Sequence, residues 1–566
     1  MINRKFVLEW ELMSGKPSRE IHCGLMPERR TSLDLVLLRS PVRDAPGLLR
    51  FALRVIAFGL LIYSGTAQEV TIPDPGLNAA IRGTIQIPTG PLTIQNLLAL
   101  TNLDAEKRNI ATLTGLEAAT NLVWLNLDSN RLGTVMVPAE LTRLQFLDLG
   151  LNSLTSCTLP AGLGDLVTLI LEDNNLSHLS LPAGLTALKD LNVGNNEIST
   201  FSLPADLASL VDFDISFNAL TNFALPSGFT NLCSVVLRGN QLASAVLVPD
   251  STSLTNLDVS ENQLGSFELP GTLTNLVDLD VSFNQLTNVT VPQGLKKLAS
   301  LDLDFNQLTA LVLPPGLGQL SELHARSNRL TSFSLPPGMA ALSYLDIGEN
   351  HLTNVALPND LTGLSLLRCS GNTELTSLSV PAGLTNLTGL YLRYNQLNDL
   401  RLPPGLSQLK LIDVLGNQLT NLTLPRGLIH LTNLFLAGNQ LTTLTLPPDM
   451  AELGWLVLDG NPLAQIVLSE QEAANLADSI SALKSQGVSV YTYPLVPQIV
   501  QPRPLVGAFQ FGILGPPGVY SVLQSVDLAK WTVVGGTTNT LGAINFTDVR
   551  PPSPGIRFYR AALPYD

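Results

Sequence analysis

The sequence predicts a solenoid of stacked coils, capped at both ends and followed by a small all-β module. Three observations support this prediction. An asparagine recurs every 22 residues over most of the chain, apolar residues keep fixed places around it, and the C-terminal stretch differs in composition. A fixed period of this size is typical of repeat proteins, in which each unit buries its apolar edges against its neighbours.

The recurring asparagines define the repeat. Sixteen of them lie 22 residues apart, except for one interval of 23 before Asn395. A degenerate coil with Arg108 at the asparagine position precedes them, giving about 17 coils. An amide side chain both donates and accepts hydrogen bonds, and buried backbone groups need such partners. We therefore expect a structural asparagine ladder made of Asn130, Asn152, Asn174, Asn196, Asn218, Asn240, Asn262, Asn284, Asn306, Asn328, Asn350, Asn372, Asn395, Asn417, Asn439 and Asn461.

The apolar residues follow the frame L-x-x-L-x-L-x-x-N-x-L, as in residues 276–286. Over roughly residues 100–463 this frame resembles the signature of leucine-rich repeat proteins. The resemblance implies a right-handed solenoid with a parallel β-sheet on its concave face. Independently, the alternation at Leu279, Asp280 and Val281 predicts a short strand.

The second half of each repeat predicts a convex side of short extended segments rather than long helices. In residues 330–342, Phe333 and Leu335 alternate, and Pro336 cannot continue a helix. Gly338 permits the chain to turn back. The leucine-proline pair in this half also resembles that of secreted bacterial repeat proteins. We find no separate catalytic domain of the kind carried by their toxin-like ligase members.

Both ends of the repeat region, 100–467, carry cap signals. In 68–99, Asp74 before Pro75 predicts the start of a helix, similar to the N-terminal cap of exported bacterial leucine-rich repeat proteins. In 468–493, Ser469 and Glu472 fit a capping box, so a helix and a following strand are expected to close the last coil.

Residues 494–505 are rich in proline and predict an extended linker. Residues 506–566 alternate aromatic or β-branched runs with Gly/Pro turns, which predicts a small β-sandwich-like module. The stretch GVYSVLQSVDLAKW within it resembles a recurrent C-terminal module of exported bacterial proteins.

Residues 1–67 predict an N-terminal extension and a signal peptide. Arg50 and Arg54 precede the apolar run 55–63, and Gly65 and Ala67 supply a cleavage site. The run is too short to span a membrane. We expect an exported protein, secreted, periplasmic or at the cell surface, with no membrane span in the mature chain. The alternative is a buried strand.

Composition narrows the function further. The net charge is −14, which disfavours nucleic acid as a partner because phosphate binding needs a basic face. Four widely spaced cysteines and five scattered histidines show no ligand spacing, so no metal or cofactor is expected. No nucleophile motif is present, and we predict that the protein is not an enzyme.

Two groups of residues on the predicted strand face are candidates for ligand binding. The first we call the acidic row: Asp258, Asp278, Asp280, Asp302 and Asp304. Like charges on strands about 4.8 Å apart repel one another, and a cation or a basic partner would relieve this. The alternative is an acidic ridge that is simply solvated and screened.

The second group we call the Arg–Tyr surface: His324, Arg326, Tyr344, Arg368, Tyr391, Arg393 and Tyr394, from four adjacent coils. Arginine and tyrosine are frequent interface anchors, and aromatic faces also stack on sugars. The alternative is a scatter of unrelated surface residues.

The expected function is a non-catalytic exported protein-binding or adhesion scaffold, with a protein or a surface glycan as partner and no cofactor. The alternative is a carbohydrate-binding or hydrolase-accessory protein that acts through the C-terminal module. Asp527, Trp531 and Asp548 would then be candidates, unless they are turn and core residues of the sandwich. A third possibility is a cell-surface spacer without a ligand.

Overall fold

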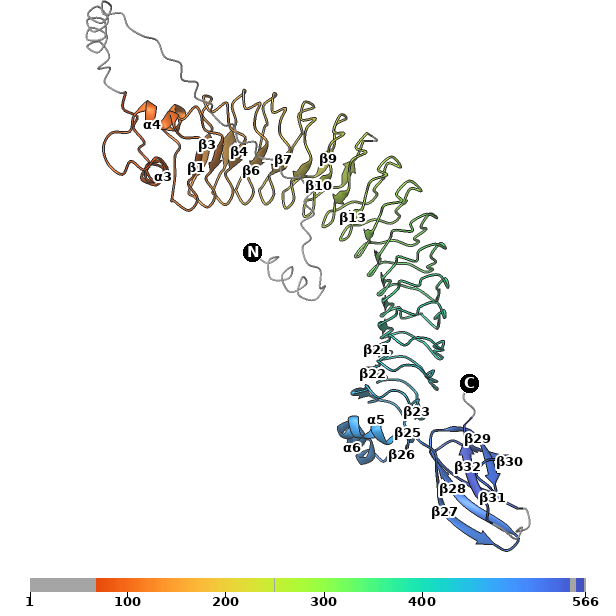
Figure 1. Ribbon diagram of the computed structural model, residues 1–566. Coiled ribbons are helices and arrows are strands. Elements are labelled where there is room, and N and C mark those ends of the chain that lie inside the picture. Colours follow the sequence, from red (N-terminus) through yellow and green to blue (C-terminus); the bar gives the residue numbers. More distant parts are fainter. Residues whose placement is uncertain (1–67, 249, 550–555, 564–566) are drawn as a thin grey trace, which may run out of the picture. The chain divides into compact units, whose positions relative to one another are not determined.

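A computed structural model describes residues 68–248, 250–549 and 556–563 (Figure 1). The predicted signal peptide, within 1–67, lies outside the described residues. The described chain begins with two helices, α3 (Pro75–Ile85) and α4 (Ile94–Leu98). It continues through the coils and ends in an all-β module.

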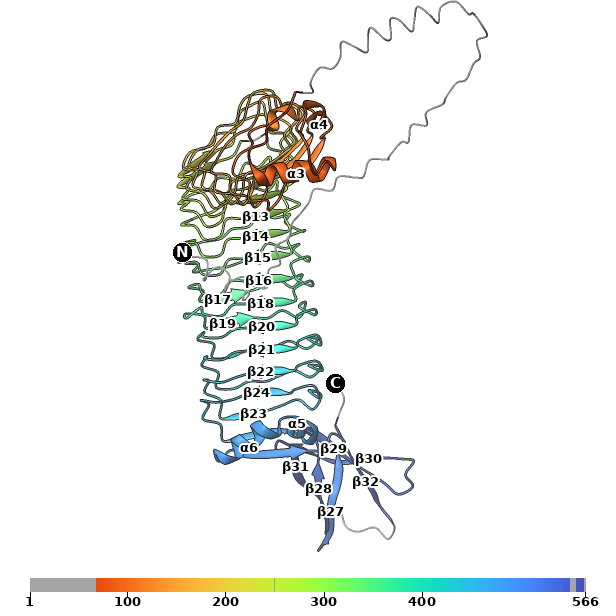
Figure 2. The ribbon, with the colours of Figure 1, turned by 90° about the vertical axis from the view of Figure 1, so that its left-hand side faces the viewer.

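The coils form one parallel sheet of 17 strands, each three residues long. Figure 2 shows the strands from β13 onward stacked one above another. Residues of neighbouring strands pair at a spacing of 22, as Leu279 pairs with Leu301, except between β18 and β20, where the spacing is 23. This confirms the leucine-rich repeat solenoid. In order of pairing, the strands are β1 (Asn102–Asp104), β2 (Trp124–Asn126), β4 (Phe146–Asp148), β6 (Thr168–Ile170), β7 (Asp190–Asn192), β8 (Asp212–Asp214), β10 (Ser234–Val236), β12 (Asn256–Asp258), β13 (Asp278–Asp280), β14 (Ser300–Asp302), β15 (Glu322–His324), β16 (Tyr344–Asp346), β18 (Leu366–Arg368), β20 (Gly389–Tyr391), β21 (Leu411–Asp413), β22 (Asn433–Phe435) and β24 (Trp455–Val457).

The second half of the coils is extended, as predicted. Where it pairs, it forms parallel strands of three residues, and in the described coils the only helical element is the 3-10 turn Leu116–Ala118. The proline after each segment explains this, since it cannot continue a helix. The strands are β3 (Thr134–Met136), β5 (Ser156–Thr158), β9 (Asn222–Ala224), β11 (Ser244–Val246), β17 (Asn354–Ala356), β19 (Ser377–Ser379) and β23 (Thr443–Thr445).

The asparagine ladder joins neighbouring coils through the side-chain amides. Oδ1 of Asn284 accepts a hydrogen bond from the backbone N–H of Leu264 in the preceding coil, at 2.9 Å. Its Nδ2 donates to the carbonyl of Val259 in that coil at 3.0 Å and to that of Val281 in its own coil at 3.2 Å. Fourteen of the sixteen ladder asparagines are buried. The side chains point inward and satisfy backbone groups that the turn would otherwise leave unpaired.

The residue before each ladder position has a left-handed backbone in all 17 coils. Five of these residues are glycines, all in the coil of β10 or in later coils, but the other twelve are not glycine. A non-glycine residue pays roughly 1 kcal/mol for this conformation. The bonds of the adjacent asparagine therefore have to hold the turn in place.

The interval of 23 residues shows how strictly the ladder is kept. Oδ1 of Asn395 accepts a hydrogen bond from the N–H of Asn372, the ladder residue of the preceding coil. In other coils, Oδ1 accepts from the N–H two residues after the preceding ladder asparagine, as Asn284 does from Leu264. Nδ2 of Asn395 still reaches the preceding coil, at the carbonyl of Cys369. The extra residue is absorbed in the loop, and Leu366 of β18 simply pairs with Gly389 of β20.

Helices lie at both ends of the coils, within the segments for which caps are predicted. Asp74 accepts from the N–H of Leu77 at 3.0 Å, at the start of α3, and also from the N–H of Ala111 at 2.7 Å in the first coil. At the other end, Ser469 and Glu472 form the predicted capping box. It opens α5 (Glu470–Asn475), which is followed by α6 (Ala477–Ser485). The strands β25 (Gln465–Ser469) and β26 (Ser489–Tyr493) extend the row begun by β23.

The C-terminal module consists of two three-stranded antiparallel sheets around a small aromatic core, which includes Phe511 and Tyr520. This confirms an all-β module. One sheet contains β27 (Gln498–Leu505), β28 (Ala508–Leu514) and β31 (Ala543–Asp548). The other contains β30 (Thr532–Asn539), β29 (Gly518–Ser525) and β32 (Phe558–Ala562).

The predicted linker 494–505 is wrong over its last eight residues, because these form β27. The strand pairs only with β28 and has an irregular register between Val500 and Arg503. Prolines lack a backbone donor, but an edge strand tolerates them on its unpaired side or at a bulge. The other predicted segment boundaries stay predictions.

The ladder yields a test of stability. Replacing Asn284 with alanine leaves the buried N–H of Leu264 without its partner and removes one of the two amide donors to each of the carbonyls of Val259 and Val281. This should lower the free energy of unfolding by about 3 kcal/mol. Urea unfolding followed by circular dichroism measures the loss. The matched control is Asn275→Ala, a more exposed asparagine whose Nδ2 donates to Thr252 O, and it should cost less than about 1 kcal/mol. Equal losses in the two variants would contradict the role of the ladder.

Candidate functional site

The predicted ligand-binding residues all lie on the face of the 17-stranded sheet or just after its strands. In each strand the middle residue is buried, while the first and third residues face away from the core. The third residues of successive strands pair in register and form a continuous row. The row runs through Asp258, Asp280, Asp302, His324, Asp346, Arg368 and Tyr391. The fold thus brings the two candidate groups together on seven adjacent strands.

The aspartates of this row have a structural task that the sequence did not reveal. Ten of the 17 third positions carry Asp or Asn, and in all ten the side-chain oxygen accepts a hydrogen bond from the backbone N–H two residues on. The distances are 2.7–3.4 Å. This is the Asx turn typical of these residue types. The ten residues are Asp104, Asn126, Asp148, Asn192, Asp214, Asp258, Asp280, Asp302, Asp346 and Asp413.

The acidic row is therefore not a solvated ridge along its whole length. Asp302 and Asp304 are only 4% and 6% exposed, while Asp258, Asp278 and Asp280 are half-buried. The carboxylates fold back onto the loop backbone, and this brings them out of water. At Asp258 and Asp280 the hydroxyl of the serine two residues on donates to the same oxygen, so the motif D-x-S was the available signal.

Arg368 occupies the centre of the Arg–Tyr surface. Its guanidinium carbon lies 5.7 Å from the ring centroid of Tyr344 and 5.1 Å from that of Tyr391, so two aromatic faces hold it from neighbouring strands. Cation–π contacts of this kind favour a positive charge at the site. Within the described residues, Arg368 has no ion pair and its Nε has no hydrogen-bond partner.

The two other arginines of this surface are already paired with carboxylates. Arg326 forms an ion pair with Glu349 at 2.5 Å, and Arg393 pairs with Asp413. Burial raises the pKa of Asp413, although Arg393 opposes the shift. Glu349 and Asp413 were not predicted. Their spacing in the sequence could have predicted them, because Glu349 follows Arg326 by 23 residues and Asp413 continues the row of third strand positions.

These side chains surround a hollow of about 300 Å³ on the sheet face. All three arginines line it, together with two of the tyrosines and two acids. The lining side chains are Arg326, Asp346, Glu349, Arg368, Ser370, Tyr391, Arg393 and Tyr394. His324 and Tyr344 lie beside it, with their rings stacked at 4.6 Å.

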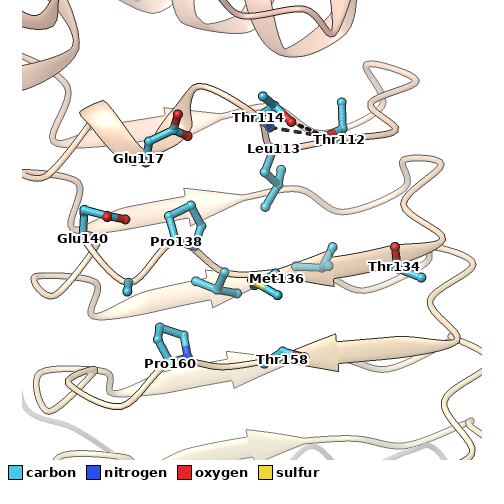
Figure 3. A pocket seen from close by; sticks show the side chains of 13 residues that line it. Thr112, Leu113, Thr114, Glu117, Thr134, Met136, Pro138, Glu140, Thr158 and Pro160 are labelled. Atoms are coloured by element: carbon cyan, nitrogen blue, oxygen red, sulfur yellow. Dashed lines mark hydrogen bonds between the residues drawn. The ribbon is translucent and has the colours of Figure 1, made fainter.

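A second hollow, of about 560 Å³, lies over the extended segments on the other side of the first coils. Figure 3 shows Met136, Pro138 and Pro160 around it, with Glu117 and Glu140 at one side. Thr112 and Thr114 hydrogen bond to each other at its edge. None of the predicted binding residues lies there.

The residues of the alternative function do not converge. Asp527 accepts from the N–H groups of Ala529 and Lys530, at 2.9 and 2.8 Å, in the turn after β29, and these bonds lower its pKa. Trp531 donates to a carbonyl of the same turn. Asp548 ends β31 in the other sheet, is buried, and accepts from the hydroxyl of Tyr559. Each has a structural partner.

The described cysteines are free thiols. Burial raises the pKa of Cys157 to about 12 and raises that of Cys369 further. A thiol with a raised pKa is a poor nucleophile and a poor ligand at neutral pH.

Asp258 yields a prediction about pH. Burial raises its pKa, although the two bonds from Ser260 oppose the shift, so the folded protein holds this proton more readily than the unfolded chain. Ionised Asp258 therefore lowers the free energy of unfolding progressively as pH rises from about 3.9. Asp258→Asn keeps an oxygen for Ser260 and should be more stable than wild type at pH 7, with the difference lost near pH 3. Urea unfolding at both pH values checks this.

The control is Asp399→Asn, which removes an exposed carboxylate paired with Arg401 and should change the unfolding midpoint little. Asp258→Asn less stable than wild type at pH 7 would show that the charge contributes more than its burial costs.

Comparison with known proteins identifies the repeats. Residues 149–257 and 368–478 match the BspA-type leucine-rich repeat region, in six copies. No curated protein matches the chain. Among the described residues, no helix is both long and apolar enough to cross a membrane.

Several solved structures are similar. One is the functional domain of InlJ from Listeria monocytogenes, which includes a cysteine ladder: identity is 17%, coverage is 79% of this chain and 97% of that one, and the TM-score is 0.55. YopM from Yersinia enterocolitica is 25% identical over 74% of this chain and 92% of its own, with a TM-score of 0.49. On the shared fold, the chain is a leucine-rich repeat solenoid, and its two matched stretches carry repeats similar to the BspA type.

Proposed function

We propose that the protein is a non-catalytic, exported binding scaffold that holds a protein partner on the sheet face between β12 and β20. Arg368 is the single observation that carries this proposal. It is a charged residue held between two tyrosines on a hollowed surface, with no ion pair among the described residues. Arginine and tyrosine are, with tryptophan, the residue types enriched among interface hot spots.

The size of the surface fits a protein. The acidic row and the Arg–Tyr surface occupy seven adjacent strands, which at about 4.8 Å per strand span about 29 Å. A standard interface buries about 800 Å² on each partner, an area of similar width. The face offers acids at one end and arginines with tyrosines at the other. A partner with the opposite order of charges would be selected over one with uniform charge.

The non-catalytic role is inferred from what the polar groups already do. The row aspartates accept backbone N–H groups, Arg326 and Arg393 are bound to carboxylates, and His324 lies against Tyr344. Acids that hold the turns of a scaffold are not available for proton transfer. Export is inferred from the signal-like segment within 51–67, which lies outside the described residues.

The test is a double variant. Arg368→Ala with Tyr391→Ala should reduce the binding of a captured partner at least a hundredfold, because it removes the cation and one of the two rings that hold it. The wild-type chain is used to capture proteins from envelope and extracellular fractions. The affinity of each captured protein is then measured for wild type and variant by surface plasmon resonance.

The matched control removes the same chemistry elsewhere on the face: Arg238→Ala with Phe217→Ala, another arginine over an aromatic ring, at 5.6 Å. This variant should bind as wild type does. A partner that is lost equally in both double variants, or in neither, contradicts the proposed surface. For a glycan partner, the binding affinity would fall with Tyr391→Ala but not with Arg368→Ala, since stacking on a sugar needs the ring and not the guanidinium.

A further inference from the structure

Three metal-ligating side chains meet at the boundary between the acidic row and the Arg–Tyr surface. Asp302 and His324 are paired neighbours on β14 and β15, and Asp304 follows β14 by two residues. One carboxylate oxygen from each aspartate and a ring nitrogen of His324 lie within 4.8 Å of one another. In the described part of the chain, no other group of three such residues comes this close.

The histidine is the distinctive member of this group. It is 8% exposed, and its Nε2 has no hydrogen-bond partner among the described residues. Nδ1 lies 3.9 Å from Oδ2 of Asp304, and Nε2 lies 3.9 Å from Oε2 of Glu322, both too long for a hydrogen bond. Burying an imidazole without hydrogen-bond partners for its nitrogens is unfavourable unless another group or an ion binds them.

The surroundings hold the three groups in place. Oδ1 of Asp302 accepts from the N–H of Asp304 at 3.0 Å, and Oδ1 of Asp304 accepts from the N–H of Arg326 at 2.6 Å. The ring of His324 is stacked on Tyr344, with 24° between their planes. Fixed carboxylates and a fixed imidazole around one point are what a metal site requires.

We propose that Asp302, Asp304 and His324 form a binding site for one divalent transition-metal ion of the zinc class, which ties the coil of β14 to the coil of β15. Zinc takes oxygen and nitrogen ligands at about 2.0–2.2 Å, so its ligand atoms lie roughly 3.4 Å apart. Small rotations of the three side chains bring atoms now within 4.8 Å to that separation.

The ligand types select the ion. Calcium and magnesium prefer oxygen ligands only, whereas imidazole favours zinc and its neighbours. Metal-bound histidines usually donate their second ring N–H to a carboxylate. With Nδ1 on the ion, Nε2 would point toward Glu322, the carboxylate already 3.9 Å away. The competing arrangement is an imidazole held between Asp304 and Glu322 alone, with no ion at all.

The experiment uses the full chain without a polyhistidine tag, stripped with EDTA and then dialysed free of it. Calorimetric titration with zinc chloride should show one ion per chain that depends on this site. His324→Gln and Asp302→Asn should each weaken that binding at least tenfold. Asn at 302 keeps an oxygen for the N–H of Asp304, so the turn is preserved.

Two matched controls accompany these variants. Asp280→Asn changes the same position one strand earlier, where the aspartate makes the same bond to the N–H of Ser282, at 2.9 Å. His178→Gln removes an exposed histidine that contacts only Ser177. Both should bind zinc as wild type does. Unfolding midpoints of all variants in EDTA verify that each one is folded.

Three outcomes would overturn the proposal. These are no zinc binding to the wild-type chain, equal binding in all four variants, and calcium binding that is tighter than zinc binding and unaffected by His324→Gln. The first is the result expected if the two carboxylates alone hold the imidazole.

Discussion

The side-chain amide of the ladder asparagine is the interaction on which the rest of the structure depends. Where each coil turns away from the sheet, its backbone groups are buried and have no strand partner. Asn284 bonds to one N–H and three carbonyls there, and two of these four groups belong to the preceding coil. The same hydrogen bonds thus stabilise the turn within one coil and connect that coil to the preceding one. They also compensate for the left-handed residue before the asparagine, a residue that is strained wherever it is not glycine.

Because of the ladder, spacing along the sequence determines which side chains are neighbours in space. Once the ladder fixes each coil at 22 residues, side chains 22 or 23 positions apart lie next to each other on the surface. Arg238 meets Glu261 in this way at 2.8 Å, and Arg326 meets Glu349. The Arg368 sandwich has the same origin, since Tyr391 is its register partner on β20 and Tyr344 begins β16, the adjacent strand on the other side. The proposed binding surface is assembled by strand register alone.

The sequence is sufficient to predict the solenoid, the helices at its two ends and the location of the candidate face. These follow from periodicity and from local signals such as Asp74 and the capping box at Ser469. The sequence is not sufficient to predict the environment of the aspartates. Alternation places Asp302 outside the core, but it does not show that the carboxylate folds back onto Asp304 N–H and becomes buried. Likewise, composition alone makes residues 498–505 look like a linker. Only their pairing with β28 makes them an edge strand.

The third-position row shows where the chain departs from its own structural rule. Ten coils use Asp or Asn there to hold the turn, and seven do without that bond. The exceptions Ile170, Val236, Phe435 and Val457 are apolar. The remaining three are His324, Arg368 and Tyr391, all within β15 to β20 and all chemically able to recognise a ligand. Giving up a local stabilising contact in favour of such residues is characteristic of functional sites. The departure of these coils from the Asx-turn rule supports the proposed binding surface for a reason independent of their exposure.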